Sequence, residues 1–143
     1  MINQAYMQFK ASFCNPFQKE IIDLGYMDKD SIIENFKKIP WIEMLKHMGT
    51  RNENEIYYSP SLEVENTATK HGLCISAVGN PEDFEYYIFY KRPKTLKTFF
   101  GLKEKFNENY VTDKTEQTTQ DVIDCLQALI NGNTEFLDKK IGP

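Results

Sequence analysis

Apolar and polar residues follow a period of two through the middle of the chain. In residues 84–91, one side of an extended segment would carry Phe84, Tyr86, Ile88 and Tyr90, and the other Glu85, Tyr87, Phe89 and Lys91. A Gly-Asn-Pro breaker at 79–81 separates this segment from an apolar run that follows His71. Two such runs joined by turn residues predict a β-hairpin.

Two shorter stretches before the hairpin are also predicted to be strands. Residues 61–66 alternate strictly, with aliphatic side chains on one side and the carboxylates of Glu63 and Glu65 on the other. Residues 55–58 form a short apolar run that ends at a Ser-Pro pair. The links between these runs are short, whereas parallel strands need crossovers of about a dozen residues or more. We therefore predict an antiparallel meander of three to five strands, built mainly from residues 55–92.

The residues outside this central region follow the helical period instead. In the N-terminal part, Phe17, Ile21 and Leu24 recur at i, i+4 and i+7, and further helices are predicted over residues 32–39 and 40–48. Near the C-terminus, one apolar stripe is formed by Val122, Cys125, Leu126, Leu129 and Ile130. A Thr-Asp pair spaced like a capping box precedes this stripe, at Thr118 and Asp121. We expect this C-terminal amphipathic helix to pack on the sheet.

The segment that links the sheet to the C-terminal helix has a mixed pattern. Pro93 lacks a backbone donor, so we predict that it ends the last clear strand. Residues 91–106 then fit either a short helix or an ordered loop. Since the chain shows no internal repeat and no low-complexity linker, residues 1–143 are predicted to form a single α+β domain with N-terminal helices.

Composition and charge place the chain among acidic folded proteins. Of its 143 residues, 41% are hydrophobic and 27% are charged, and the formal net charge is -4. No apolar run reaches the roughly 18 residues that a membrane span needs, and the N-terminus lacks the pattern of a signal peptide. The three cysteines are far apart and form no CxxC motif, which favours free thiols in a reducing compartment. We therefore expect a cytoplasmic protein with no membrane partner.

The charges are unevenly distributed along the chain. Residues 51–90 carry seven acidic and two basic side chains, and residues 91–105 carry six basic and one acidic. The basic stretch also contains phenylalanines, a combination that single-stranded nucleic-acid binders use. The overall acidity and the acidic segment directly upstream argue against a nucleic-acid partner. The simpler interpretation is that the phenylalanines dock on the sheet while the lysines remain in water.

Side chains with catalytic or metal-binding chemistry are few. The two histidines, His47 and His71, form no metal-ligand spacing with each other or with a cysteine pair. His71 and Cys74 are three residues apart on a predicted strand, which places them on opposite faces and argues against a nucleophile pair. Glycine motifs for nucleotide binding and the serine elbow of the α/β-hydrolases do not occur. We expect no catalytic residue, no metal site and no cofactor.

The remaining candidate is a binding surface on the predicted sheet. Its residues would be Glu63, Glu65, Glu85, Tyr87, Phe89 and Lys91. Because rings lie on both sides of residues 84–91, either a second layer buries Tyr87 and Phe89 or these two are partly exposed. An exposed aromatic patch beside charges is typical of a protein-contact surface. This favours a non-enzymatic protein-binding module of the immunity, chaperone or regulatory type; the alternative is a small-molecule-binding protein or an enzyme with a pocket between sheet and helices.

Overall fold

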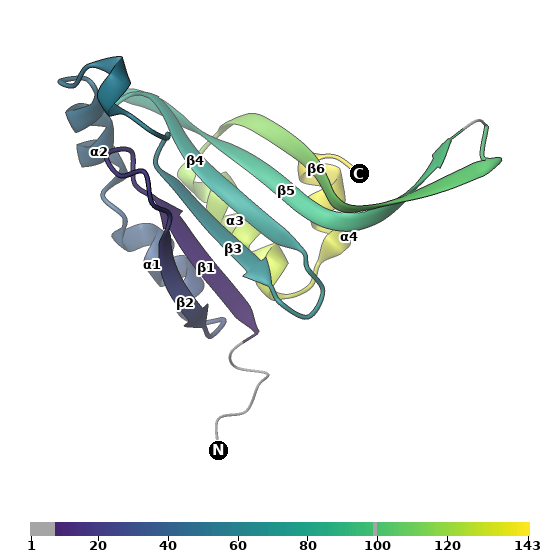
Figure 1. Cartoon of the computed structure of the whole chain (residues 1–143). Coiled ribbons are helices and arrows are strands. Elements are labelled where there is room, and N and C mark those ends of the chain that lie inside the picture. Colours follow the sequence, from purple (N-terminus) through teal and green to yellow (C-terminus); the bar gives the residue numbers. More distant parts are fainter. Residues whose placement is uncertain (1–7, 99) are drawn as a thin grey trace.

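The computed structural model describes residues 8–98 and 100–143, and these form an antiparallel sheet with helices on one side of it (Figure 1). The elements in chain order are β1 (Phe9–Cys14), β2 (Ile22–Met27), α1 (Ile32–Lys38), α2 (Trp41–Met48), the 3-10 helix η2 (Glu53–Glu55), β3 (Ser61–Asn66), β4 (Gly72–Asn80), β5 (Asp83–Thr98), β6 (Lys103–Gln117), α3 (Thr119–Ile130) and α4 (Thr134–Ile141). Within the described residues the sheet has six strands in the order β2-β1-β3-β4-β5-β6. The α+β class and the antiparallel sheet are thus confirmed, while the predicted number of three to five strands is wrong.

Alternate residues of the strands point toward the helices and form the core. The strands contribute Phe9, Ala11, Phe13, Leu62, Val64, Leu73, Ile75, Ala77, Tyr86, Ile88 and Tyr90, all of them buried. Trp41 of α2 lies at the centre of this layer, since its ring contacts both Phe13 and Tyr86 edge-on at 6.1 and 5.6 Å between centroids. Its indole N–H donates to the carbonyl of Phe36 at 3.1 Å, which satisfies the one polar atom that the ring buries.

Residues 9–27 form a β-hairpin where the sequence analysis predicted a helix. Alternation in β1 places three apolar side chains on the core side, and this period of two decides the structure. Ile21 and Leu24, which had suggested a helical stripe, are both exposed. Gly25 has a φ of +77° and lies opposite Ala11, where the register shifts. The glycine therefore permits a β-bulge and does not end a helix.

The sequence predictions for residues 32–58 are partly right. The helices predicted over 32–39 and 40–48 are confirmed as α1 and α2. The short strand predicted over 55–58 is wrong, because the chain there follows η2 in an irregular conformation. The Tyr57 N–H donates to the carbonyl of Pro16 at 2.8 Å, so this segment is tied to the β1–β2 connection and not to a strand ladder.

Strands β5 and β6 continue past the rest of the sheet as a two-stranded arm, which projects from the body of the molecule in Figure 1. Pro93 does not end β5, contrary to the prediction. The pairing with β6 shifts between Arg92 and Lys94, so that β6 has extra residues opposite the proline and its missing N–H disturbs no regular ladder. The expectation of a helix or loop over 91–106 is therefore wrong for the described residues.

The C-terminal helices follow the predicted pattern. Thr118 and Asp121 form the predicted capping box of α3, with the Asp121 N–H donating to Thr118 Oγ1 and the Thr118 N–H donating to Asp121 Oδ2. The apolar stripe of α3 is buried against the sheet, and α4 packs beside it. Among the described residues, no helix is both long enough and apolar enough to cross a membrane.

Asp121 also makes the free energy of unfolding depend on pH. Its Oδ1 accepts from Lys140 Nζ at 2.7 Å, and this bond together with the Thr118 N–H holds the pKa of the carboxyl down at about 2. Since the folded pKa is depressed, the stabilisation is present above the unfolded pKa near 4 and is lost as the pH falls toward 2. We expect Asp121→Asn to lower the free energy of unfolding by about 1 kcal/mol at pH 7, a value reduced for solvent screening, and by clearly less at pH 2, where about half of the Asp121 carboxyls are protonated. Urea denaturation of both proteins between these pH values measures the difference, and a gap as large at pH 2 as at pH 7 would contradict the assignment.

Candidate functional site

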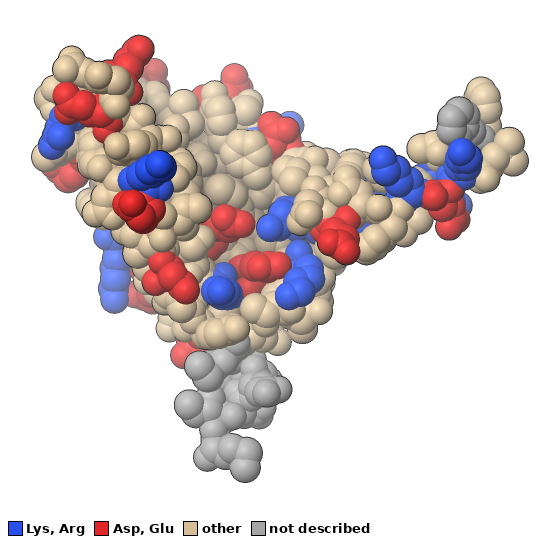
Figure 2. Space-filling view, viewed as in Figure 1, with Lys and Arg blue, Asp and Glu red and all other residues tan. Residues whose placement is uncertain are grey.

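The side of the sheet that faces away from the helices is not covered by any other described element. We call this surface the open face; the strand register places on it Lys10, Ser12, Asp23, Glu63, Glu65, Cys74, Glu85, Tyr87, Phe89, Lys91 and Asp113, together with the exposed Tyr26 and Val111 on the edge strands. Its two basic side chains are outnumbered by five carboxylates, and Figure 2 shows how charged and uncharged side chains are distributed on this side of the molecule. The open face is therefore an acidic surface.

The strand register brings all six predicted site residues onto the open face. Glu63 pairs with Cys74, and Cys74 pairs with Phe89, so these three side chains form one row across β3, β4 and β5. Glu65 and Lys91 both pair with Gly72 and form the next row. Lys91 Nζ also lies 3.7 Å from Glu63 Oε1, which joins the two rows through an ion pair.

The remaining predicted residues, Glu85 and Tyr87, lie farther along β5. Tyr87 pairs with Ser76 of β4, and Glu85 pairs with Val78. Glu85 is thus beyond the end of β3, whose last pair with β4 joins Ser61 and Ser76, and it does not lie beside Glu63. The carboxylates on this face are spread along the sheet and do not form one cluster.

The rings of Tyr87 and Phe89 are half-buried on the open face. The residues opposite them on β4, Ser76 and Cys74, have small side chains. Each ring therefore projects above its neighbour and remains in contact with solvent. Among residues 8–98 and 100–143, no second layer covers this face. Tyr87 and Phe89 are therefore partly exposed and are not buried by a second layer. The two rings form an aromatic patch on β5, beside the edge strand β6.

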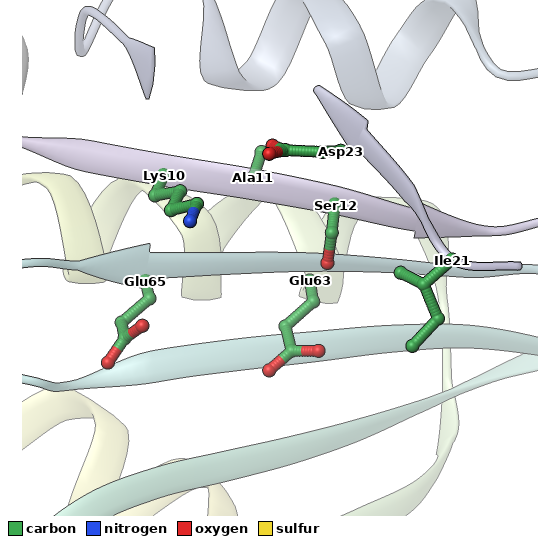
Figure 3. Close-up of a pocket in the computed structure, with 7 residues that line it drawn as sticks. All are labelled: Lys10, Ala11, Ser12, Ile21, Asp23, Glu63 and Glu65. Atoms are coloured by element: carbon green, nitrogen blue, oxygen red, sulfur yellow. The ribbon is translucent and has the colours of Figure 1, made fainter. Parts of the chain in front are cut away.

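A shallow cavity of about 250 Å³ lies at one side of the open face, over β1, β2 and β3 (Figure 3). Its lining residues are Lys10, Ala11, Ser12, Ile21, Asp23, Glu63 and Glu65. In Figure 3, Glu63 and Glu65 leave β3 on the same side, and Lys10 lies on the neighbouring strand with its ammonium directed toward β3. Sequence reasoning missed the contributions of β1 and β2, although the alternation of Phe9, Ala11 and Phe13 marks β1 as a strand.

His71 and Cys74 lie on opposite sides of the sheet. Cys74 faces the open side, whereas the His71 ring lies against Tyr90, with 2.9 Å between His71 Nδ1 and the Tyr90 hydroxyl. Burial and the nearby carboxylate of Glu63 raise the pKa of Cys74 to about 11, so its thiol is protonated at neutral pH. Burial and the charge of Arg92 lower the pKa of His71. Within the described residues, no group of three or more His, Cys, Asp or Glu side chains is arranged to hold a metal ion.

The three cysteines, Cys14, Cys74 and Cys125, are unpaired in the structure. We expect a thiol titration of the denatured, unreduced protein to count three groups. In the native protein the reaction should be slow, because burial raises the pKa of all three thiols and Cys125 is fully buried. A count of one in the denatured protein would mean that a disulfide forms and would contradict the structure.

The open face thus carries two aromatic rings on β5, dispersed carboxylates and shallow cavities at its margins, and its cysteine, Cys74, lies beside the Glu63 carboxylate on the side of the sheet away from His71. Another cavity, of about 290 Å³, lies between the β1–β2 hairpin and helices α1 and α2. Its lining is mostly apolar and includes Phe13, Ile22, Leu24 and Met44.

Comparisons of the chain with protein-family models, with curated proteins and with solved structures gave no match.

Proposed function

We propose that this protein is a non-enzymatic protein-binding module and that the open face is its contact surface. The observation that carries the proposal is the position of Tyr87 and Phe89, which lie half-buried on β5, beside the edge strand β6, on a sheet face that no described helix covers. Aromatic side chains are enriched at the centres of protein interfaces, because they bury a large area and lose little conformational entropy. A partner that covers both rings would remove them from water.

The charges around the rings indicate the chemistry of the partner. Carboxylates exceed basic groups on the open face, and the ion pair between Glu63 and Lys91 is partly exposed to solvent. Such a surface attracts a partner that presents basic side chains around an apolar patch. Steering of this kind raises the association rate, and it weakens as salt shortens the range of the field.

A pocketed protein is the second candidate, and the cavity beside α1 and α2 supports it. That cavity lies between the sheet and the helices and is largely apolar, as a small-molecule site requires. Its volume of about 290 Å³ is at the lower end of the range for ligand pockets, roughly 300–1,000 Å³. Its polar lining residues are Asn15, Asn35 and Lys38, and the lining contains no histidine, cysteine or carboxylate. We therefore rank this function below protein binding.

Charge reversal on the open face tests the proposed function once a partner has been recovered from the native source. Glu63→Lys combined with Glu65→Lys should weaken binding more than tenfold and reduce the dependence of the association rate on salt. The matched control combines Glu20→Lys with Glu34→Lys, which changes the net charge equally at exposed positions outside the open face. Equal losses in the two double variants would show that only net charge matters, and would count against the open face.

A further inference from the structure

The arm ends in apolar side chains that are exposed to solvent. We define the arm as residues 94–107, in which β5 and β6 pair with each other beyond the rest of the sheet, from Lys94 and Asn107 to Thr98 and Lys103. Phe100 is fully exposed at its end, and 86% of Leu102 is accessible to solvent. Neither side chain contributes to the core. Folding therefore does not explain why these two positions are apolar.

The backbone of the arm's end is held in an unusual conformation. Phe100 has a φ of 56° and Gly101 has a φ of 85°, so two consecutive residues lie in the left-handed region. Glycine adopts this region without strain, but a bulky side chain such as phenylalanine rarely does. Strained residues of this kind concentrate at functional sites. A glycine at position 100 would suit the turn better, which indicates that the ring itself is what the position requires.

Basic side chains lie directly behind the apolar end. The arm carries Lys94, Lys97, Lys103 and Lys105 against the single carboxylate of Glu104. In Figure 2, blue side chains with red ones between them lie along the arm, and uncharged atoms lie at its far end. The order along the arm is thus an apolar end, then lysines, then the acidic body of the protein.

The acidic body does not cancel the charge of the arm. Six residues of extended strand, from Pro93 to Thr98, span about 20 Å. The Debye length at physiological ionic strength is about 8 Å, so charges on the open face are strongly screened at the end of the arm. An approaching surface therefore meets the arm as a separate basic element, in spite of the net charge of -4 on the whole chain.

We propose that the arm inserts end-first into the interfacial region of an anionic lipid bilayer. The order along the arm matches the depth order of a bilayer surface, with Phe100 and Leu102 among the acyl chains and the lysines at the level of the phosphates. A nucleic-acid contact requires cations at the end of the arm, where the side chains are apolar. A protein cleft does not require apolar side chains at the end and lysines behind them. We expected no membrane partner because the chain has no long apolar run. That expectation concerns segments that span a bilayer, and it does not bear on a contact at the bilayer surface.

Sedimentation with lipid vesicles tests the proposal. The full chain should bind vesicles of phosphatidylcholine with 30% phosphatidylglycerol at least tenfold more tightly than vesicles of phosphatidylcholine alone, because each lysine near an anionic surface contributes about fivefold. Phe100→Gly should reduce this binding about tenfold or more, and it relieves the backbone strain, so the variant keeps the fold. Tyr57→Ser is the matched control, since Tyr57 is an exposed ring outside the arm, and it should bind like the unchanged protein.

Charge reversal provides a second test of the proposal. Lys97→Glu with Lys105→Glu should abolish the preference for phosphatidylglycerol, whereas Lys29→Glu with Lys37→Glu, outside the arm, should retain most of it. The proposal is overturned if the unchanged protein shows no preference for the anionic vesicles, if Phe100→Gly binds them normally, or if both charge reversals act equally. Tighter binding to a single-stranded oligonucleotide than to the vesicles, unaffected by Phe100→Gly, would likewise overturn it in favour of a nucleic-acid contact.

Discussion

Replacing Arg92 with alanine is expected to lower the free energy of unfolding by about 2–4 kcal/mol. Only 4% of this side chain is accessible to solvent, yet it carries a full charge. Its guanidinium donates to the Tyr90 carbonyl at 2.9 Å, to Thr112 Oγ1 at 2.6 Å and to the Gly142 carbonyl at 2.8 Å. Truncation removes one donor from each of these acceptors and breaks the direct bond from β5 to the C-terminal residues, which remain bonded to β6 through Thr112 and Tyr110.

Contacts with aromatic rings and with one carboxylate add to these hydrogen bonds. The guanidinium carbon lies 4.0 Å from the ring centroid of Tyr90 and 4.8 Å from that of Tyr110. Asp138 Oδ1 is 3.6 Å from Arg92 Nη2, but its side chain is 40% exposed, so water can hydrate the carboxylate after truncation. For this reason we expect a value below the upper limit for a broken buried ion pair, about 5 kcal/mol.

Urea denaturation at pH 7 measures the Arg92 effect, and a lysine variant separates charge from geometry. Lysine keeps the positive charge but cannot reproduce the planar fork of donors, so Arg92→Lys should cost about 1–2 kcal/mol. If Arg92→Ala changes the free energy of unfolding by less than about 1 kcal/mol, the guanidinium does not fasten the C-terminus to the sheet.

Replacing Leu126 with alanine is expected to lower the free energy of unfolding by about 2–5 kcal/mol. Leu126 is fully inaccessible to solvent and lies on the face of α3 that packs on the sheet. Alanine is a good helix former, so the helix itself is not weakened. The loss comes from the apolar surface that is no longer buried and from the cavity that the shorter side chain leaves.

The residue that follows Leu126 provides the control. Gln127 is exposed on the other side of α3, and its amide donates to Asn131 Oδ1 at 3.3 Å. Gln127→Ala should therefore change the free energy of unfolding by less than about 0.5 kcal/mol. Similar values for the two variants would mean that α3 does not depend on its buried face.

The parts of the fold that the sequence predicted correctly are those with a clear period over enough residues. The stripe of α3 spans more than two helical turns, and β4 and β5 combine β-branched and aromatic residues on both sides of a turn. The β1–β2 hairpin was missed because three apolar residues outside its buried face, among them Ile21 and Leu24, fit a helical spacing by coincidence. In a hairpin at the edge of a sheet, few side chains are buried, so the period of two is short and weak.

The arm was missed for a different reason. Its residues are mostly exposed, so burial imposes no apolar alternation on them, and what holds the two strands together is their backbone pairing. Pro93 then suggested an end to the strand, because the extra residues of β6 that accommodate it are distant in sequence.

The candidate site was predictable in composition but not in arrangement. Alternation alone placed Glu63 with Glu65, and Tyr87 with Phe89, on common faces. The ion pair between Glu63 and Lys91 depends on the order of the strands, in which β4 lies between β3 and β5. Asp23 and Asp113 join the open face through β2, which lies in a segment predicted as helix, and through β6, the strand at the opposite edge of the sheet.

Site-specific photo-cross-linking tests the central claim most directly. A photoreactive phenylalanine analogue at position 89 samples the aromatic patch of the open face, and the same analogue at position 42 samples the exposed side of α2 in the helical layer. In the native source, the proposed function predicts a discrete protein adduct from position 89 that diminishes when Tyr87→Ala is added, and no such adduct from position 42. Adducts from position 42 only, or from neither position, would contradict the assignment of the open face as a protein-contact surface.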